Sequence, residues 1–358
     1  MEADEAGQQV LAYGGDPPLA TALLRCRPED FQVVEELPFA LSGEGEHVWL
    51  LLCKRNTNTV WLARQLARIA GVRLVDVGYA GLKDRHGLTT QWFSVNLSGK
   101  KEPAWATALE SATVQVLKVI RHSRKLQRGA LKGNRFLLTL RHFQGDREVV
   151  CDRLTQIKVA GTPNYFGPQR FGRGGQNLDQ VHRWFSGGKP PRGRYLRGLL
   201  LSAARAFLFN RVLSERVQAA NWRQPLPGEA LILDGSHGFF VAETIDEALQ
   251  ARVRRFDCHP SGPLWGRGES PAKRMSRALE EEVLADYALW REGLEQAGLK
   301  QERRSLRLMV ADLEWSFPPA MDSLQLHFRL PAGAYATTVL REVVRTQEAV
   351  EQPFLLDE

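Results

Sequence analysis

The chain has 358 residues, of which 43% are hydrophobic and 25% charged, a composition typical of a globular protein with one or two domains. Its net charge of +7 favours an acidic partner, most often nucleic acid, although many proteins are mildly basic without one. The four cysteines form no CxxC pair, which argues against a disulfide framework and a zinc site. The acidic N-terminal segment lacks the features of a signal peptide, and no apolar stretch is long enough to span a bilayer. We therefore expect a cytoplasmic protein without a membrane partner.

The first part of the chain reads as strands and helices of one mixed sheet. Strands are predicted at 32–37 and 47–54, and a helix follows with Thr57 or Asn58 as its cap and Gly71 at its end. The remaining predicted elements of this part are strands at 88–97, 113–121 and 134–143 and a helix at about 146–161.

The composition changes after Gly161. Residues 161–200 are rich in Gly, Pro and Arg, and helices are then predicted from Ser202 and from Ser270.

The last part of the chain returns to a sheet pattern. SLQLHFRL at 323–330 alternates as a strand does, and residues 335–348 are predicted as a closing helix. If this late strand completes the first sheet, the fold class is α+β (mixed α/β), and the middle of the chain is an insertion in one domain.

Two regions carry an excess of base. Residues 111–145 contain eight Lys or Arg and no acid, and 163–200 contain seven basic residues against one Asp, with aromatic rings between them. Such a pattern is typical of a surface that binds phosphates and exposed bases. Alternatively, the cations form a solvated face and the aromatic residues belong to a core. The candidate RNA-backbone ligands are Arg124, Lys125, Arg128, Lys132, Arg170 and Arg173.

Motifs for nucleotide cofactors, zinc and hydrolase triads are missing from the sequence. FGRGGQN has no GK[ST] ending, and no GxGxxG, HExxH, GxSxG or EF-hand loop occurs. We expect an enzyme, if it is one, to use side chains alone, with no metal and no cofactor.

One carboxylate, Asp84, stands out in GYAGLKDRHGLTTQWFSV (78–95). With Gly87 at the fourth position it fits a type I turn before a strand. However, two cations flank it, and the small residues before it allow a ligand to come close. Asp84 is therefore either an ordinary turn residue or a nucleophile or base.

Several motifs together resemble one family. RPEDFQVVEE, GEGEHVWLLLCKRNTNT, GYAGLKDRHGLTTQWFSV, RKLQRGALKGNRF, NYFGPQRFGRGGQN and LPAGAYATTVLRE are similar, in this order, to motifs of the TruD family of tRNA pseudouridine synthases. The resemblance extends from about Leu24 to Thr346.

The resemblance implies an isomerase that converts uridine to pseudouridine in tRNA at position 13, without a cofactor and without an obligate protein partner. It also implies a pseudouridine-synthase-like catalytic domain with a mixed, largely antiparallel sheet and a helix-rich insertion. The expected domains are catalytic for 1–158 and 307–358 and the family's insertion for 159–306.

The family's site residues match positions in this chain. Asp84 matches the essential nucleophile, and Arg25 stands where the family has Lys and is expected to align Asp84. The residues expected around the target base are Phe31, Asn134, Phe136 and Tyr335, the last replacing Phe.

These residue types suit a base that is flipped out of an RNA helix, because rings stack on the base and an amide can both donate to and accept from uracil. Attack of Asp84 at C1′, formation of a glycal and attack at C6 all remain open. Two other functions compete with this one. A non-catalytic RNA-binding protein would not need Asp84, and a glycosidase-like hydrolase would need a second carboxylate, for which only Asp76 and Glu35 lie near in the sequence.

Overall fold

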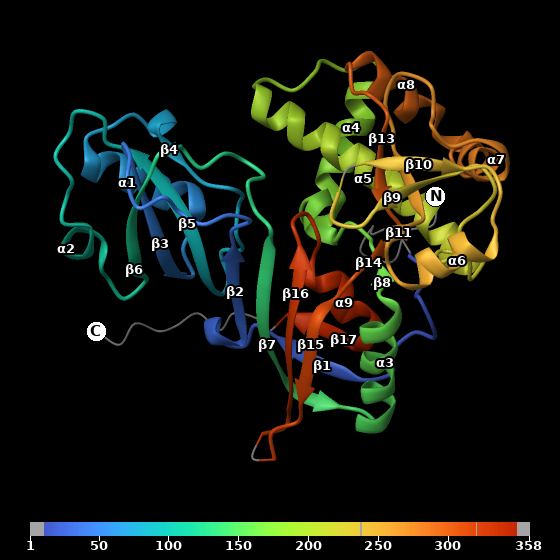
Figure 1. Cartoon of the computed structure of the whole chain (residues 1–358), viewed down its shortest axis with the longest axis horizontal. Coiled ribbons are helices and arrows are strands. Elements are labelled where there is room, and N and C mark those ends of the chain that lie inside the picture. Colours follow the sequence, from blue (N-terminus) through green and yellow to red (C-terminus); the bar gives the residue numbers. More distant parts are fainter. Residues whose placement is uncertain (1–10, 237, 320, 349–358) are drawn as a thin grey trace. The chain divides into compact units, whose positions relative to one another are not determined.

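The computed structural model describes residues 11–236, 238–319 and 321–348 (Figure 1). The chain separates into two compact units. Unit 1 consists of residues up to 17, 159–309 and 337–342, and unit 2 consists of 18–158, 310–336 and residues from 343 onward.

A ten-stranded sheet forms the centre of unit 2. Its main path is β15–β16–β7–β2–β5–β3–β6; β1 pairs with β7 and β17, and β4 pairs with β5. Among the described strands of this sheet, only the β1–β17 and β2–β5 pairs are parallel, which confirms the predicted mixed, largely antiparallel sheet. The strands are β1 (Thr21–Leu24), β2 (Phe31–Glu36), β3 (His47–Arg55), β4 (Val77–Gly78), β5 (Leu88–Asn96), β6 (Val114–His122), β7 (Gly133–Gln144), β15 (Ala311–Ser316), β16 (Ser323–Pro331) and β17 (Arg345–Glu348).

Helix α1 (Thr59–Ala70) shows how local sequence sets the ends of an element. The Asn58 side chain accepts hydrogen bonds from two amides of the first turn, and Gly71, with φ of 59°, ends the helix. Leu62 and Leu66 are buried in one core with residues of β3 and β5. The other helical elements that begin in unit 2 are η1 (Pro28–Asp30), η2 (Leu74–Asp76), α2 (Trp105–Leu109) and α3 (Arg147–Ala160).

The prediction for the end of the chain was partly wrong. Helix α9 (Ala336–Val343) ends five residues before the predicted end at 348, and β17 follows it instead of more helix. The reason is tertiary, because β17 pairs with β1, which precedes it by more than three hundred residues. The strand predicted at 323–330 is present as β16, with Leu324, Leu326 and the following alternate residues buried.

Unit 1 is built around the long helix α5 (Arg194–Gln218), whose middle is almost completely buried. The helix begins eight residues before the predicted Ser202, and of this added part Leu200 and Leu201 are buried. Helix α7 begins at Arg274 rather than at Ser270. The other elements are β8 (Thr162–Pro163), η3 (Pro168–Phe171), η4 (Arg173–Gly175), α4 (Gln176–Phe185), β9 (Glu229–Leu233), β10 (Phe239–Ala242), α6 (Glu247–Arg254), β11 (Cys258–His259), β12 (Ser261–Leu264), α7 (Arg274–Val283), η5 (Ala285–Tyr287), α8 (Ala288–Gln296), β13 (Glu302–Ser305) and β14 (Arg307–Leu308).

Candidate active site

The Asp84 turn connects β4 with β5 in unit 2. The chain bends at 85–87, and the Gly87 amide donates to Asn56 Oδ1 at 3.3 Å. This differs from the predicted type I turn, in which that amide often donates to the Asp84 carbonyl. Gly87 has φ of 154°, and a Cβ atom there would lie 2.6 Å from the Phe31 carbonyl oxygen. Glycine therefore lets the turn approach β2, while the Asp84 side chain stays 48% exposed.

Lys54 holds this turn from the interior of unit 2. The residue is 1% exposed, and its Nζ donates to the Thr57 carbonyl at 2.8 Å and to the Asp84 carbonyl at 3.0 Å. Burial lowers the pKa of Lys54 to about 8, and the negative charge of Asp84 opposes that decrease. The backbone position of Asp84 thus depends on a buried amino group.

Arg25 lies against both Asp84 and Phe31. Its Nη2 donates to Asp84 Oδ2 at 3.4 Å, and its guanidinium carbon lies 4.1 Å from the centroid of the Phe31 ring. Arg25 has φ of 61°, a backbone conformation that is uncommon for residues other than glycine. The arginine thus contacts both the carboxylate and the aromatic ring.

Phe31 of β2 and Asn134 and Phe136 of β7, the predicted residues of these two strands, lie on one face of the sheet. Glu35 pairs directly with Asn134, and Val33 pairs with Phe136, so these side chains and that of Phe31 share a face. This register brings together residues that are about a hundred positions apart in the sequence.

Three phenylalanine rings form the aromatic part of this face. The ring centroids of Phe31 and Phe136 are 6.4 Å apart, and Phe136 stacks on Phe328 of β16 at 5.3 Å. Phe31 and Phe136 are 1% and 6% exposed. Both predicted stacking rings are therefore covered by the protein's own atoms.

A buried polar group lies beside these rings. Lys83 Nζ is 2.7 Å from Asn134 Oδ1 and 3.0 Å from Glu35 Oε1, and the Trp92 amide donates to Glu35 Oε2 at 2.8 Å. The side chains of Lys83 and Glu35 are 8% and 0% exposed. The Asn134 amide, which is expected to contact the base, thus lies against a buried ion pair.

Tyr335 is half-buried and lies in the loop between β16 and α9. At the end of β16, Leu330 pairs with Asn134 and Pro331 with Gly133. The segment that leads to Tyr335 therefore leaves the sheet beside Asn134.

Lys54, Lys83, Glu35 and Phe328 were not predicted as site residues. Two of them had a signal in the sequence: Lys54 continues the inward phase of Val48, Leu50 and Leu52, and Glu35 continues that of Phe31 and Val33. A charged residue at an inward position of a strand needs a buried partner, which makes it a candidate for a role beyond solubility.

The basic loop between β6 and β7 is attached to the sheet. The Leu126 amide donates to Ser94 Oγ at 2.9 Å, Lys125 donates to the Val75 carbonyl, and the Arg128 guanidinium lies 3.6 Å from the Tyr79 ring centroid. Arg124, Arg128 and Lys132 are exposed. The loop therefore presents its cations from a defined backbone.

The two basic candidates of unit 1 differ from each other. Arg170 is partly buried, donates to Ser202 Oγ at 3.1 Å and lies over the Phe166 ring at 5.5 Å, whereas Arg173 is exposed. Tyr165, Phe166 and Phe171 are buried, so these aromatic residues of the Gly-rich segment belong to the core of unit 1.

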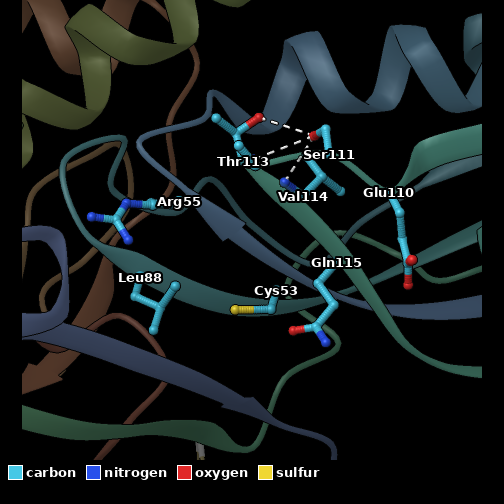
Figure 2. A pocket seen from close by; sticks show the side chains of 9 residues that line it. Cys53, Arg55, Leu88, Glu110, Ser111, Thr113, Val114 and Gln115 are labelled. Atoms are coloured by element: carbon cyan, nitrogen blue, oxygen red, sulfur yellow. Dashed lines mark hydrogen bonds between the residues drawn. The ribbon is translucent and has the colours of Figure 1, made fainter.

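A depression of about 350 Å³ lies near one end of β3, β5 and β6 in unit 2 (Figure 2). Its wall includes Cys53, Arg55 and Leu88, and the side chain of Ser111 accepts hydrogen bonds from the amides of Thr113 and Val114. None of the predicted site residues lines it. The depression therefore does not mark the chemistry that the motifs indicate.

The two carboxylates considered as a second acid are unsuited to that role. Glu35 is fully buried, and its Oε1 is paired with Lys83 Nζ at 3.0 Å. Asp76 lies in η2 rather than in a strand, and its hydrogen bond with Arg73 lowers the pKa of Asp76. In a glycosidase, the carboxylic acid that protonates the leaving group has a raised pKa.

Within the residues that the structure describes, no group of three or more His, Cys, Asp or Glu is placed to hold a metal ion. In the same part of the chain no helix has both the length and the apolar character needed to cross a membrane.

Comparison with a solved structure supports this architecture. A crystal structure from Methanosarcina mazei, described as a candidate tRNA pseudouridine synthase D, matches with a TM-score of 0.69 at 21% identity and covers 95% of this chain and 97% of its own. At that identity the match shows the shared fold.

Sequence comparisons agree over nearly the whole chain. The model of the tRNA pseudouridine synthase D (TruD) family matches residues 10–184 and 193–343. A tRNA pseudouridine synthase D of Nitrosococcus oceani is 99% identical over all 358 residues and matches along its full length. Another, of Methylococcus capsulatus, is 51% identical over 90% of both chains. The chain therefore belongs to the tRNA pseudouridine synthase D (TruD) family and is an RNA pseudouridine synthase, an isomerase.

Proposed function

We propose that the chain forms pseudouridine at position 13 of tRNA and that Asp84 is its nucleophile. The observation that carries the nucleophile is the Asp84 turn itself. Its carboxylate is half exposed, its carbonyl accepts a hydrogen bond from Lys54, and Arg25 donates to its Oδ2. A nucleophile needs this combination of an accessible side chain and a backbone held in place. Position 13 is supported by the resemblance to bacterial TruD proteins.

The reaction is an isomerisation, so no atom is gained or lost. In the route through C1′, an Asp84 oxygen forms a bond to C1′ and the N1–C1′ bond breaks, leaving its electron pair on uracil. The base then turns, its C5 forms a bond to C1′, and the Asp84 carboxylate leaves. The C5 proton goes to a base or water, and N1 is protonated. The glycal route and attack at C6 would use the same carboxylate.

The flipped uridine would lie against the sheet face of β2 and β7. Phe31 and Phe136 supply rings, Asn134 supplies an amide, and Tyr335 follows the strand that pairs with Asn134. Stacking and one amide contact suit a base that has left its helix.

Exposed and partly buried cations of both units would bind the backbone of the RNA. A tRNA substrate also implies a cytoplasmic enzyme. The proposed ligands are Arg124, Lys125, Arg128 and Lys132 in unit 2 and Arg170 and Arg173 in unit 1. We also propose that 1–158 and 307–358 form the catalytic domain and 159–306 the insertion. The compact units support a division near residues 158 and 309, but they also assign the described residues before 18 and residues 337–342 to unit 1.

Asp84→Asn tests the nucleophile. We expect no pseudouridine in single-turnover assays and a tRNA affinity within a few fold of the native enzyme, because an amide is a poor nucleophile of nearly equal size. Asp76→Asn is the matched control, since it also removes a carboxylate from unit 2. Activity of Asp84→Asn comparable with that of the control would reject the nucleophile. Mapping pseudouridine in total RNA of cells with and without the protein tests position 13.

A further inference from the structure

The polar group formed by Glu35, Lys83 and Asn134 has a consequence for base recognition. Its members come from β2, from the residue before Asp84 and from β7. Lys83 Nζ lies 2.7 Å from Asn134 Oδ1 and 3.0 Å from Glu35 Oε1.

An ammonium group has three hydrogen-bond donors and no acceptor. The atom of Asn134 that faces Lys83 must therefore be its carbonyl oxygen, and the NH₂ group of the same amide must point away from Lys83. The orientation of an asparagine amide is often ambiguous, but here the partner determines it.

The ammonium group is itself held in place. The Glu35 side chain is 0% exposed, and its second oxygen accepts the Trp92 amide at 2.8 Å. A buried carboxylate of this kind is strongly destabilised when it loses the cation paired with it. The ion pair thus holds the Lys83 ammonium group beside Asn134.

We propose that Lys83, backed by Glu35, is a positioning residue that turns the NH₂ group of Asn134 toward the flipped base, so that the site reads a carbonyl oxygen of uracil. This proposal rests on the proposed function, in which Asn134 contacts the base. It narrows that function, because the amide then acts as a donor only. Uracil offers two such oxygens, whereas cytosine carries an amino group in place of one of them.

A double-mutant cycle separates this role from a structural one. The first change is Asn134→Ala. The second replaces the ion pair as a unit, Glu35→Gln with Lys83→Met, so that no buried charge is left alone. The third combines both. Single-turnover rates at saturating and at low tRNA, tRNA affinity and thermal unfolding are measured for each.

We expect Asn134→Ala to reduce the single-turnover rate at low tRNA about 30- to 100-fold, as expected when a buried hydrogen bond to substrate is lost. The pair replacement should reduce it about tenfold or more, and the combined variant should be no slower than Asn134→Ala alone. Asn134→Asp should lose activity like Asn134→Ala, since it places an acceptor where the donor was.

A combined variant whose loss equals the product of the separate losses would overturn the proposal, because Lys83 would then act independently of Asn134, for example through Asp84. An active Asn134→Asp would overturn it too. Failure of the proposed function would be detected in a separate experiment, in which the Asp84→Asn variant would keep its activity. If the pair replacement does not fold, the comparison of Asn134→Asp with Asn134→Ala still decides the matter.

Discussion

The buried amino group of Lys54 should titrate near pH 8 and make the stability of unit 2 depend on pH. The residue is 1% exposed, and burial is the main cause of the decrease in its pKa from 10.5 to about 8. Lys54→Met is the informative change, since it keeps much of the apolar length of the side chain and removes the ionising group. It also removes the hydrogen bonds to the carbonyls of Thr57 and Asp84.

The size of the effect follows from the two pKa values. Below about pH 8 the amino group of Lys54 is charged in both the folded and the unfolded chain. Between about pH 8 and 10.5 the unfolded chain binds more protons, so the free energy of unfolding rises with pH. The rise is about 1.4 kcal/mol by pH 9 and about 3 kcal/mol above pH 10.5. This added stability is fully present above the pKa of Lys54 in the unfolded chain. It is lost as the pH falls through the pKa of Lys54 in the folded chain.

Nuclear magnetic resonance of lysine labelled at the ε carbon measures the titration directly, and the Lys54→Met spectrum assigns the signal. Urea unfolding of both proteins, followed by signals of unit 2, measures the linked stability at neutral pH and at pH 9. We expect the native protein to gain stability relative to Lys54→Met over this interval. In Asp84→Asn the midpoint should move to lower pH, because the Asp84 charge raises the pKa of Lys54. A midpoint near 10.5, with parallel stability curves, would refute the reasoning.

Two further perturbations test the basic loop between β6 and β7 and its packing. Replacing Arg124, Lys125 and Arg128 by Gln should weaken tRNA binding, most strongly at low salt. In filter binding, the slope of log K against log salt concentration should become shallower by up to about 2 to 3. An unchanged slope would mean that the loop does not contact phosphate. Gly78→Ala should lower stability by about 1–3 kcal/mol, because the new methyl group would collide with a carbonyl oxygen of this loop and with a buried serine hydroxyl. Gly81→Ala, with no atom within 4 Å of the added carbon, is its control in thermal unfolding, and equal melting temperatures would contradict the packing argument.

Local patterns were sufficient for much of the fold. The N-cap and C-terminal glycine of α1 and the alternation along β16 lie in single short segments, and the structure has both elements there. The fold class was also correct, although the family resemblance, rather than periodicity, gave the arrangement of the sheet.

Non-local contacts account for most of what the sequence did not predict. The residues of β17 were assigned to a helix because nothing near them shows that β1 is their partner. The same holds for the candidate site: Lys54 holds the Asp84 carbonyl across thirty positions, and Lys83 holds Asn134 across fifty-one. The motifs identified Asp84 and Asn134, whereas the groups that orient them depend on the register of the sheet.

The contact between Arg25 and Phe31 bears on which molecules can stack on Phe31. The guanidinium covers a ring that is proposed to receive the base, and the same side chain donates to Asp84. A base that stacks on Phe31 has to displace a cation–π contact of about 0.5–2 kcal/mol, which is similar to the gain of about 1–3 kcal/mol from stacking. A loose nucleoside therefore gains little by entering. In the proposed function, contacts with the rest of the RNA would have to drive this exchange, and Arg25 would disfavour free nucleosides in addition to contacting the carboxylate.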